Sequence, residues 1–256
     1  KATIPAGSHG KAALFSKQKG ILAGINIARK VFNKIDSHTN FKALINDGEK
    51  INPGDMIFRV EGDPVSLLSS ERLALNFMQR MSGIATYTRE IVDKLHGLKT
   101  EVLDTRKTTP LMRELEKYAV RTGGGYNHRF GLFDMIMIKD NHVDFAGGID
   151  KAIMSTRKYL DDNSKDLKIE IEVRNFDELK QVLKTGHVHR IMLDNFSVPD
   201  LRAAVQMING NFETEASGGI TIENIRDYAE TGVDYISVGA LTHQIKSLDM
   251  SMKALD

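Results

Sequence analysis

Five residues that carry or can carry positive charge cluster in the middle of the chain, after short runs of β-forming residues: Arg106, Lys107, His128, Arg129 and Lys139. The whole chain has a net charge of only +1, so this cluster is a local feature. Guanidinium groups bind carboxylates or phosphates through paired hydrogen bonds, and a lysine acts as a point charge. A surface ion pair with Asp104 or Asp140 would explain any one of these cations. It is a poorer explanation for all five together. The pattern predicts a site for a small polyanion.

Two carboxylates, Glu172 and Asp194, lie at the ends of two later β-rich runs. Carboxylates in a cationic site can hold Mg²⁺, which keeps several waters and bridges to substrate oxygens. They can equally accept hydrogen bonds from ribose hydroxyls, or form structural ion pairs with nearby lysines. The residues alone leave these three interpretations open.

Glycine-rich segments indicate where backbone comes close to a ligand. Gly123–Gly125 follows a predicted helix; one of its glycines suits a helix C-cap, and three in a row favour a loop that approaches a ligand. Ser217–Gly219 and Ser237–Gly239 follow the last two predicted strands, which is the position of the phosphate site in α/β barrels.

Arg72 is predicted to lie on a helix that Asp63 and Pro64 begin, on one face with Leu68 and Leu75. An arginine on an apolar stripe either lays its alkyl chain on the apolar surface and keeps its guanidinium group in water, or points into an interface or ligand site. The spacing does not choose between these interpretations.

The elements that position these residues change in character along the chain. Before Lys94 the sequence predicts strands at residues 11–15 and 56–60, a helix from Ile25, a hairpin between Asn46 and Asp55, and a helix from Pro64 to Met81 that ends at Ser82–Gly83. From Leu98 on, β-rich runs alternate with helical segments, the first of which is capped by Thr109–Pro110. The runs are 101–103, 135–138, 169–173, 191–193, 212–216 and 235–238. This alternation predicts parallel strands in a closed barrel or an open doubly wound sheet, with ligands at the carboxyl ends of the strands.

Composition narrows the class of protein. With 256 residues, 41% of them hydrophobic and 27% charged, the chain is expected to fold as one large domain or two unequal ones, not to be disordered. Its near-zero net charge argues against a nucleic-acid partner. The absence of cysteine excludes disulfides and thiolate metal sites and fits a cytoplasmic setting. No apolar run reaches the ~18 residues of a membrane span, so no membrane partner is expected.

The basic first 31 residues also suit a transit peptide, although their strand and helix patterns favour a folded element. Because the sequence does not begin with Met, we expect that it starts after the first residue of the protein.

Several runs together resemble the central signature of the quinolinate phosphoribosyltransferase family: Leu103–Pro110, Glu116–Val120, Gly123–Arg129 and Ile138–His142. Shorter segments extend the resemblance over nearly the whole chain: Glu71–Arg72, Ala74–Asn76, Ser82–Thr86, Leu193–Asn195, Ser217–Ile220 and Val238–His243. The chain departs from the family at Leu111, where glycine is usual, and lacks the family's usual segment before Lys1.

The resemblance implies an α/β fold: an incomplete α/β barrel with an N-terminal open antiparallel α/β sandwich domain. The sandwich would comprise residues 1–97 joined by 241–256, and the barrel, residues 98–240, would carry the active site. The resemblance further implies a cytoplasmic enzyme that forms an obligate homodimer, with a hexamer as a further assembly, and whose site is completed by the partner's N-terminal domain.

The implied reaction converts quinolinate and phosphoribosyl pyrophosphate into nicotinate mononucleotide, pyrophosphate and carbon dioxide, with Mg²⁺. By the same resemblance, quinolinate would be held by Arg72 of the partner subunit together with Thr105, Arg106, His128, Arg129 and Lys139. Lys107 would meet the pyrophosphate, and Glu172 and Asp194 the ribose hydroxyls and Mg²⁺; these three are the expected catalytic residues. The phosphoribosyl phosphate would be bound by Ser217, Gly218, Gly219, Val238, Gly239 and Ala240.

Two alternatives remain on the same scaffold. One is the molybdate-operon paralogue of the family, against which the intact Asn127–Arg129 and Lys139–His142 runs argue. The other is a catalytically silent phosphosugar-binding protein, which would tolerate loss of Glu172 or Asp194.

Overall fold

The computed structural model describes residues 3–5 and 7–255. The chain divides into two compact units. Unit 1 contains Lys1–Glu90, Thr108–Gly125 and Leu241–Asp256, and unit 2 contains Ile91–Lys107 and Tyr126–Ala240. Among the described helices, none combines the length and the hydrophobicity that a bilayer crossing requires.

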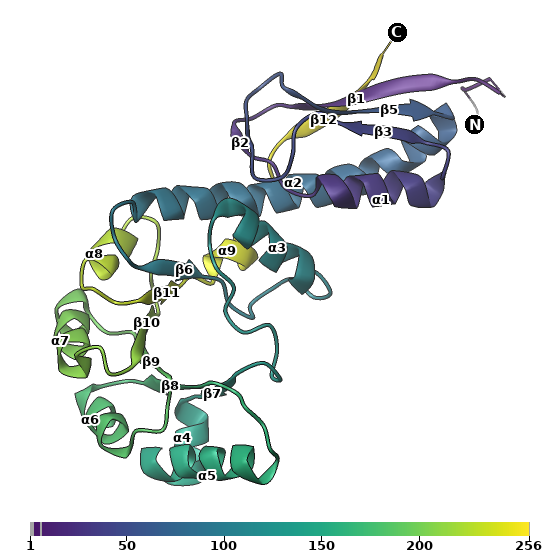
Figure 1. Cartoon of the computed structure of the whole chain (residues 1–256). Coiled ribbons are helices and arrows are strands. Elements are labelled where there is room, and N and C mark those ends of the chain that lie inside the picture. The colour runs from purple at the N-terminus through teal and green to yellow at the C-terminus, as the bar shows by residue number, and fades with distance from the viewer. Residues whose placement is uncertain (1–2, 6, 256) are drawn as a thin grey trace. The chain divides into compact units, whose positions relative to one another are not determined.

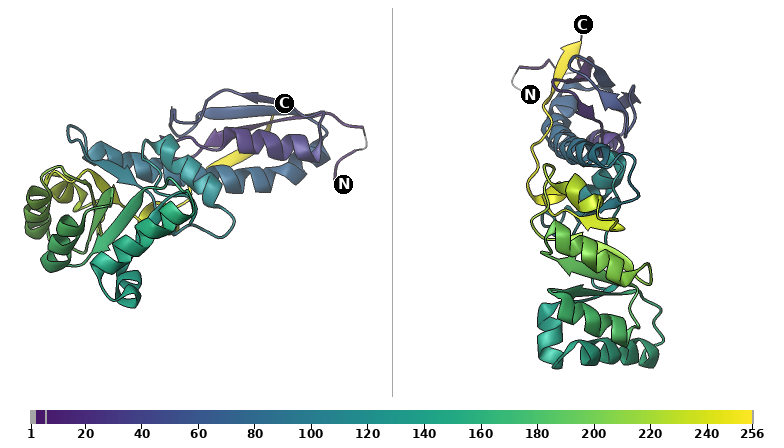
Figure 2. Two further views of the ribbon diagram at one scale, coloured as in Figure 1. Left: turned by 60° about the horizontal axis from the view of Figure 1, so that its bottom comes forward. Right: turned by 90° about the vertical axis from the view of Figure 1, so that its left-hand side faces the viewer.

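Unit 1 is built on a four-stranded antiparallel sheet. Its strands run in the order β12 (Met250–Leu255), β1 (Gly10–Ser16), β5 (Met56–Gly62) and β3 (Asn40–Ala43). The first and last strands of the chain are therefore neighbours, with Lys11 opposite Leu255, and the yellow β12 lies beside the purple β1 in Figures 1 and 2.

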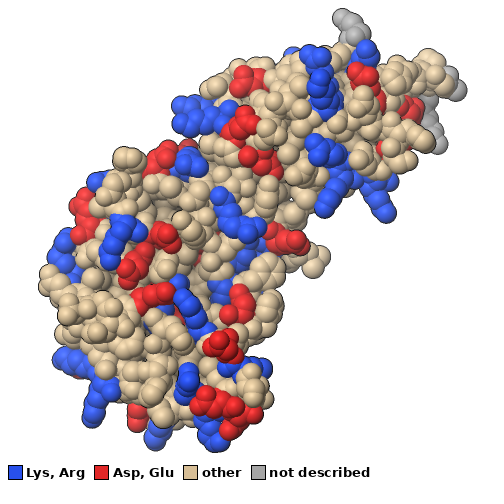
Figure 3. All heavy atoms as spheres, in the orientation of Figure 1, with Lys and Arg blue, Asp and Glu red and all other residues tan. Residues whose placement is uncertain are grey.

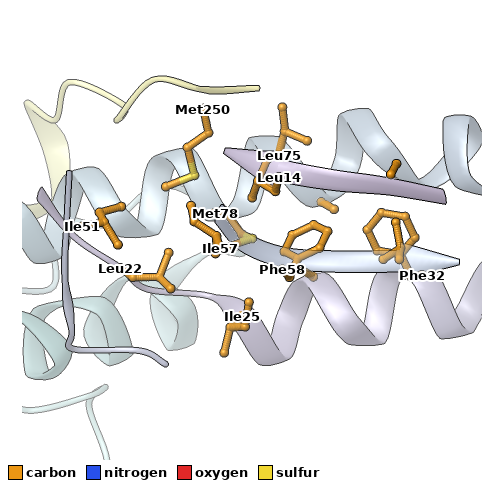
Figure 4. Close-up of a cluster of buried hydrophobic side chains, with 14 of the residues drawn as sticks. Leu14, Leu22, Ile25, Phe32, Ile51, Ile57, Phe58, Leu75, Met78 and Met250 are labelled. Carbon is orange, nitrogen blue, oxygen red and sulfur yellow. The ribbon is translucent and has the colours of Figure 1, made fainter. Parts of the chain in front are cut away.

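Two helices of unit 1 supply the other half of its core: α1 (Ile25–Ile35) and α2 (Pro64–Lys94). Figure 4 shows Phe32 of α1 and Met78 of α2 close to Phe58 of the sheet, and the rings of Phe32 and Phe58 meet edge to face with 5.8 Å between centroids. Burial of such apolar area is the main stabilising contribution to this unit.

The end predicted for the long helix at Ser82–Gly83 is wrong, because α2 continues to Lys94. Both residues are buried in tertiary contacts. The Ser82 hydroxyl accepts a hydrogen bond from the Ala23 N–H at 3.0 Å, and a Cβ on Gly83 would collide with the carbonyl oxygen of Lys246. Gly83 marks a close approach of two backbones and not the end of the helix.

The predicted hairpin is also corrected. Gly48 and Gly54 adopt positive φ in the two expected turns, but β4 (Lys50–Ile51) pairs with β2 (Gly20–Ile21) and not with the strand that follows it. In addition, α3 (Arg113–Gly123) begins three residues after Pro110, because Leu111 takes a left-handed conformation with φ of 64°.

Unit 2 contains a six-stranded parallel sheet in the order β6-β11-β10-β9-β8-β7. The strands are β6 (Glu101–Leu103), β7 (Ile136–Ile138), β8 (Ile169–Val173), β9 (Arg190–Asp194), β10 (Glu213–Ser217) and β11 (Tyr235–Ser237). From β7 to β11 each strand lies beside the next in sequence, and β6 joins at the β11 side. This is the order of a barrel; within the described residues β6 and β7 do not pair. The fold is therefore the expected incomplete α/β barrel.

Helices cover the outer side of this curved sheet: α4 (Asp140–Ala146), α5 (Ile149–Asp162), α6 (Phe176–Thr185), α7 (Val198–Ile208) and α8 (Ile225–Ala229). Figure 1 shows α5 to α8 along its convex side. Because side chains alternate along a strand, the buried Ile171, Ile191 and Ile236 face these helices. The intervening residues face the concave side.

Candidate active site

The concave face of the sheet in unit 2 is polar. In the strand register Glu172 lies opposite Met192, which lies opposite Glu215, and Asp194 lies opposite Ser217. With a side-chain period of two, all these residues share the face that the helices leave uncovered. Parallel strands are normally apolar on both faces, so acids at Glu172 and Glu215 indicate a functional surface.

A buried aspartate at the end of β6 organises the loop that carries His128 and Arg129. The Asp104 Oδ1 accepts a hydrogen bond from the His128 N–H at 2.9 Å, and its Oδ2 accepts one from Asn127 Nδ2 at 2.6 Å. Leu103 and Tyr126 also form an isolated parallel bridge. These contacts fasten the loop 126–129 to the carboxyl end of β6.

The residues that follow Asp104 stand at the same end of the sheet. The Lys107 N–H donates to Thr105 Oγ1 at 3.0 Å, which makes a tight polar turn. The side chains of Arg106 and Lys107 are exposed in this turn.

Two arginines are held near each other in this region. Arg129 is half-buried, and its Nη1 donates to the carbonyl oxygen of Met135 at 3.2 Å. Burial, followed by the positive charge of Arg106, lowers the pKa of Arg129 from its ordinary value. Glu170 and Asp134 act in the opposite direction on this pKa, so Arg129 lies among charges of both signs.

Lys139 and Glu172 form an ion pair at the ends of β7 and β8, with 2.9 Å between Nζ and Oε2. The glutamate side chain is nearly buried and the lysine is about half exposed. Lys139 also begins α4, and its N–H donates to His142 Nδ1 at 2.9 Å. The pair sits where a ligand over the concave face would meet both charges.

The ends of β9 and β10 are joined by their polar side chains. The Ser217 Oγ donates to Asp194 Oδ1 at 2.7 Å, and Asn195 Nδ2 donates to Asp194 Oδ2 at 2.6 Å. Gly218 has φ of 90°, and a Cβ there would collide with the side chain of Asn195. Gly219 also has a positive φ of 63°, but open space surrounds its Cβ position. The turn after β10 thus requires glycine at 218 for steric reasons.

The residues after β11 complete the carboxyl end of the sheet. The Val238 N–H donates to the Leu103 carbonyl at 2.9 Å, so this segment is tied to the end of β6. Gly239 follows, and Ala240 begins the short helix α9 (Ala240–His243). Of the predicted site residues, all except Arg72 belong to unit 2.

Arg72 lies in unit 1, on α2. It is exposed, as is Leu68, whereas Leu75 is buried, so the face proposed for these three residues is divided between core and solvent. Leu73 is also exposed, and the two leucines have exposed fractions of 57% and 50%. Arg72 therefore stands among apolar side chains on an uncovered surface of unit 1.

The glycines of Gly123–Gly125 have structural roles within unit 1. Gly124 ends α3 in the left-handed conformation, with φ of 97°, and its N–H donates to the Arg121 carbonyl. A Cβ on Gly123 would lie 2.5 Å from the Ala85 carbonyl oxygen. Capping and close packing explain these two glycines without a ligand.

Sequence reasoning missed Glu170 and Glu215, which meet His128 over the concave face. The His128 Nε2 lies 3.1 Å from Glu170 Oε2 and 3.3 Å from Glu215 Oε2, and all three side chains are buried. Their ligand-type atoms lie within 4.8 Å of one another, the spacing of a group that could hold a metal ion. The sequence does contain a sign of this group, because glutamate alternates with isoleucine in β8.

The protonation of this group is set by burial and by charge. Burial opposes a charged His128, but hydrogen bonds and charges from the two glutamates outweigh it and raise the pKa of His128 to about 9. Burial, followed by the charge of Glu215, raises the pKa of Glu170 to about 7. For Glu215, burial is outweighed by His128, Ser237 and Arg190, which lower its pKa.

On the face drawn in Figure 3, acidic and basic side chains are interspersed and form no single basic stripe. The fold and the charges at the carboxyl ends of the parallel strands define an enzyme of the parallel α/β class with a separate antiparallel domain.

Comparison with known proteins identifies the family. The model of the quinolinate phosphoribosyl transferase N-terminal domain matches residues 1–82, and that of the C-terminal domain matches residues 84–253. The chain therefore belongs to the quinolinate phosphoribosyltransferase family, which confirms the resemblance seen in the sequence.

Individual relatives agree over most of their length. The mitochondrial quinolinate phosphoribosyltransferase [decarboxylating] 2b of Nicotiana tabacum is 46% identical, over 99% of this chain and 76% of the relative. A probable nicotinate-nucleotide pyrophosphorylase [carboxylating] of Bacillus subtilis is 44% identical, over 94% and 82%. The crystal structure of NadC from Streptococcus pyogenes superposes with a TM-score of 0.94 at 41% identity, over 100% of this chain and 90% of that one.

Proposed function

We propose that this chain transfers the phosphoribosyl group of phosphoribosyl pyrophosphate to quinolinate and removes one carboxylate of quinolinate. The products are nicotinate mononucleotide, pyrophosphate and carbon dioxide. The observation that carries the proposal is the set of cations at the carboxyl ends of the strands: Arg106 in the turn after β6, Arg129 in the loop tied to that strand, and Lys139 after β7, paired with Glu172. Such an arrangement suits a dianion, and the family membership identifies which dianion it is.

The cations would bind the pyridine dicarboxylate. Arg106 and Arg129 present planar guanidinium groups, which bind carboxylates through two hydrogen bonds. Lys139 adds a point charge, and His128 and Thr105 complete the polar wall. Lys107, next to Arg106 in the exposed turn, is placed to meet the pyrophosphate.

Glu172 and Asp194 are proposed to hold Mg²⁺ and the ribose hydroxyls. Mg²⁺ prefers one or two carboxylates and keeps several waters, and these two residues offer hard oxygen atoms on one face of neighbouring strands. The donor set therefore fits the ion. When bound, Mg²⁺ would neutralise charge on the departing pyrophosphate. The turn Ser217–Gly219 and the segment Val238–Ala240 would bind the 5′-phosphate.

The reaction needs positioning and charge stabilisation more than acid–base groups. The pyridine nitrogen attacks C1 of the ribose as the bond from that carbon to the pyrophosphate oxygen breaks, and Glu172 or Asp194 faces the developing positive charge. The carboxylate beside the new cationic nitrogen then leaves as carbon dioxide. The electron pair left on the ring carbon is stabilised by that nitrogen and takes up a proton.

A homodimer, with a hexamer as a further assembly, is proposed as the working form. The support is the uncovered apolar surface of α2, where Leu68 and Leu73 flank Arg72. An exposed arginine among leucines suits an interface in which it reaches a site on the partner subunit. We further propose that the enzyme works in the cytoplasm, which suits a chain without cysteine.

The test is turnover of quinolinate labelled at the carboxylate next to the nitrogen. With phosphoribosyl pyrophosphate and Mg²⁺, labelled carbon dioxide and nicotinate mononucleotide should form in equal amounts. Nicotinate, which has one carboxylate, should be a far poorer substrate, and removal of Mg²⁺ by a chelator should stop the reaction. Equal rates with nicotinate, or no carbon dioxide, would contradict the proposal.

A further inference from the structure

The candidate site rests on a buried polar chain in which only His128 has a role in the proposed reaction. It begins at Glu170 on β8, passes through His128 to Glu215 on β10, and continues to Arg190 on β9. The Arg190 Nη1 lies 3.1 Å from Glu215 Oε2, and its Nη2 lies 3.0 Å from Glu213 Oε2. Arg190 also packs over the ring of Tyr235, 3.9 Å from its centroid. Each link joins a different strand or loop.

The two nitrogens of His128 have different partners. The Arg129 N–H points to Nδ1 at 2.6 Å, whereas Nε2 faces the two carboxylates. The carboxylates favour a ring protonated at both nitrogens, and the Arg129 N–H favours a lone pair on Nδ1. In either state Nε2 carries a hydrogen, and this nitrogen lies within ion-pair distance of Glu170 and Glu215.

Glu170 and Glu215 have few other sources of stabilisation. Both side chains are fully buried, and a buried carboxylate without a partner is costly. Glu215 also pairs with Arg190 at 3.1 Å, whereas Glu170 has its ion pair with His128 at 3.1 Å. The imidazole is thus clamped between two strands, and the loop that presents Arg129 is held with it.

We propose that Glu170 and Glu215 are positioning residues that clamp His128 through its Nε2 and so set Arg129 in place for the substrate's carboxylates. This inference rests on the proposed function. Neither glutamate touches the reacting atoms; each acts through the imidazole. Loss of one clamp should therefore weaken binding of the dicarboxylate and leave binding of the sugar pyrophosphate unchanged.

A metal ion held by the same three residues is the competing arrangement, since their spacing permits one. A ligating imidazole nitrogen must present a lone pair, and its other nitrogen normally donates a hydrogen bond. Here the Arg129 N–H already points to Nδ1, which places the hydrogen on Nε2 and favours an ion-paired clamp over a metal site.

The experiment compares Glu170→Gln and Glu215→Gln with Glu213→Gln. Glu213 is the matched control because it lies on β10 two residues before Glu215, shares its face and contacts Arg190, but does not contact His128. In the two clamp variants the KM for quinolinate should rise about tenfold or more, with the KM for phosphoribosyl pyrophosphate unchanged. The control should leave both KM values unchanged. Adding Glu170→Gln to His128→Ala should have no further effect.

A measurement on the unmodified enzyme keeps the test independent of variant folding. Long-range proton–nitrogen spectra, with His128 assigned by its loss in His128→Gln, should show hydrogen on Nε2. Hydrogen on Nδ1 alone, a stoichiometric bound metal by elemental analysis, or clamp variants with unchanged KM for quinolinate would overturn the inference. An enzyme that does not turn over quinolinate at all would instead refute the proposed function.

Discussion

Ser217 donates a hydrogen bond from its hydroxyl to Asp194 across the boundary between β10 and β9, at 2.7 Å. The two residues are also opposite each other in the strand register, and the Asn195 N–H returns a hydrogen bond to the Ser217 carbonyl at 2.9 Å. Asp194 therefore takes its orientation from the turn that carries the proposed phosphate site. In the proposed function, this hydrogen bond would join ribose recognition by Asp194 to phosphate recognition by the turn Ser217–Gly219.

Ser217→Ala is expected to lower kcat/KM for phosphoribosyl pyrophosphate on the order of tenfold, because a hydrogen bond to a charged group contributes about 1.5–3 kcal/mol. Steady-state kinetics at several Mg²⁺ concentrations would measure this. Ser197→Ala is the control, since Ser197 caps α7 and should affect stability but not kinetics. Equal kinetics for both variants would show that the contact is not functional.

Gly218→Ala should lose most activity, and Gly219→Ala should retain it. Both positions have positive φ, which disfavours a side chain, but only at 218 would the new Cβ also collide with Asn195. The comparison therefore isolates the collision from the backbone strain of about 1 kcal/mol. Thermal unfolding and kcat/KM of the two variants test this. A similar loss in both would point to strain alone.

Leu111→Gly should stabilise the protein by about 0.5–1 kcal/mol. Leu111 is fully exposed with φ of 64°, so its side chain contributes strain and little burial. The gain is reduced by the greater freedom of glycine in the unfolded chain. Urea unfolding measures it, with Leu132→Gly, at an exposed residue without positive φ, as the control. A destabilised Leu111→Gly would contradict the strain argument.

Arg72 is predicted to act across the subunit boundary. If Arg72→Ala and Lys139→Ala are each inactive, a mixed dimer has one site with both defects and one with neither. Unfolding and refolding the two together in equal amounts should restore about a quarter of wild-type activity. No recovery, with dimers confirmed by sedimentation, would place Arg72 within its own subunit's site or outside any site.

The raised pKa of His128 predicts a stability that falls as pH rises. The folded pKa, about 9, exceeds the ordinary value of 6.5. The stabilisation is therefore complete below about pH 6.5 and is lost as pH approaches 9, with an upper limit of about 3 kcal/mol. Urea unfolding across this range should show a steeper loss for the wild type than for His128→Gln. Parallel curves would mean that His128 does not change its protonation on folding.

Much of unit 2 could be predicted because its signals are local. Short apolar runs followed by polar residues indicate strand ends, and parallel strands bring those ends to one edge. The choice between a closed barrel and a doubly wound sheet could not be made from the residues, because it depends on which strand β6 pairs with. That pairing joins segments far apart in sequence.

Two of the errors share one cause, which is that tertiary contacts override a local pattern. Ser82–Gly83 has the composition of a helix end, yet packing against Ala23 and Lys246 keeps the helix intact. The clamp on His128 was missed for the same reason: Glu170 and Glu215 gain their meaning only when the loop from β6 crosses the sheet. The unusual glutamates in β8 could have indicated a functional role for Glu170, but not that its partner is His128.

The pairing of early with late strands has a consequence for synthesis on the ribosome. In unit 2, β7 to β11 can add one by one as they emerge, but β6 waits for β11. In unit 1, β1 pairs with β5 on one side, but its other edge is covered only by β12. Contacts so distant in sequence form slowly, and unpaired strand edges invite aggregation. Nascent chains halted before residue 235 lack both β11 and β12, so they should have an uncovered strand edge in each unit and depend most on chaperones.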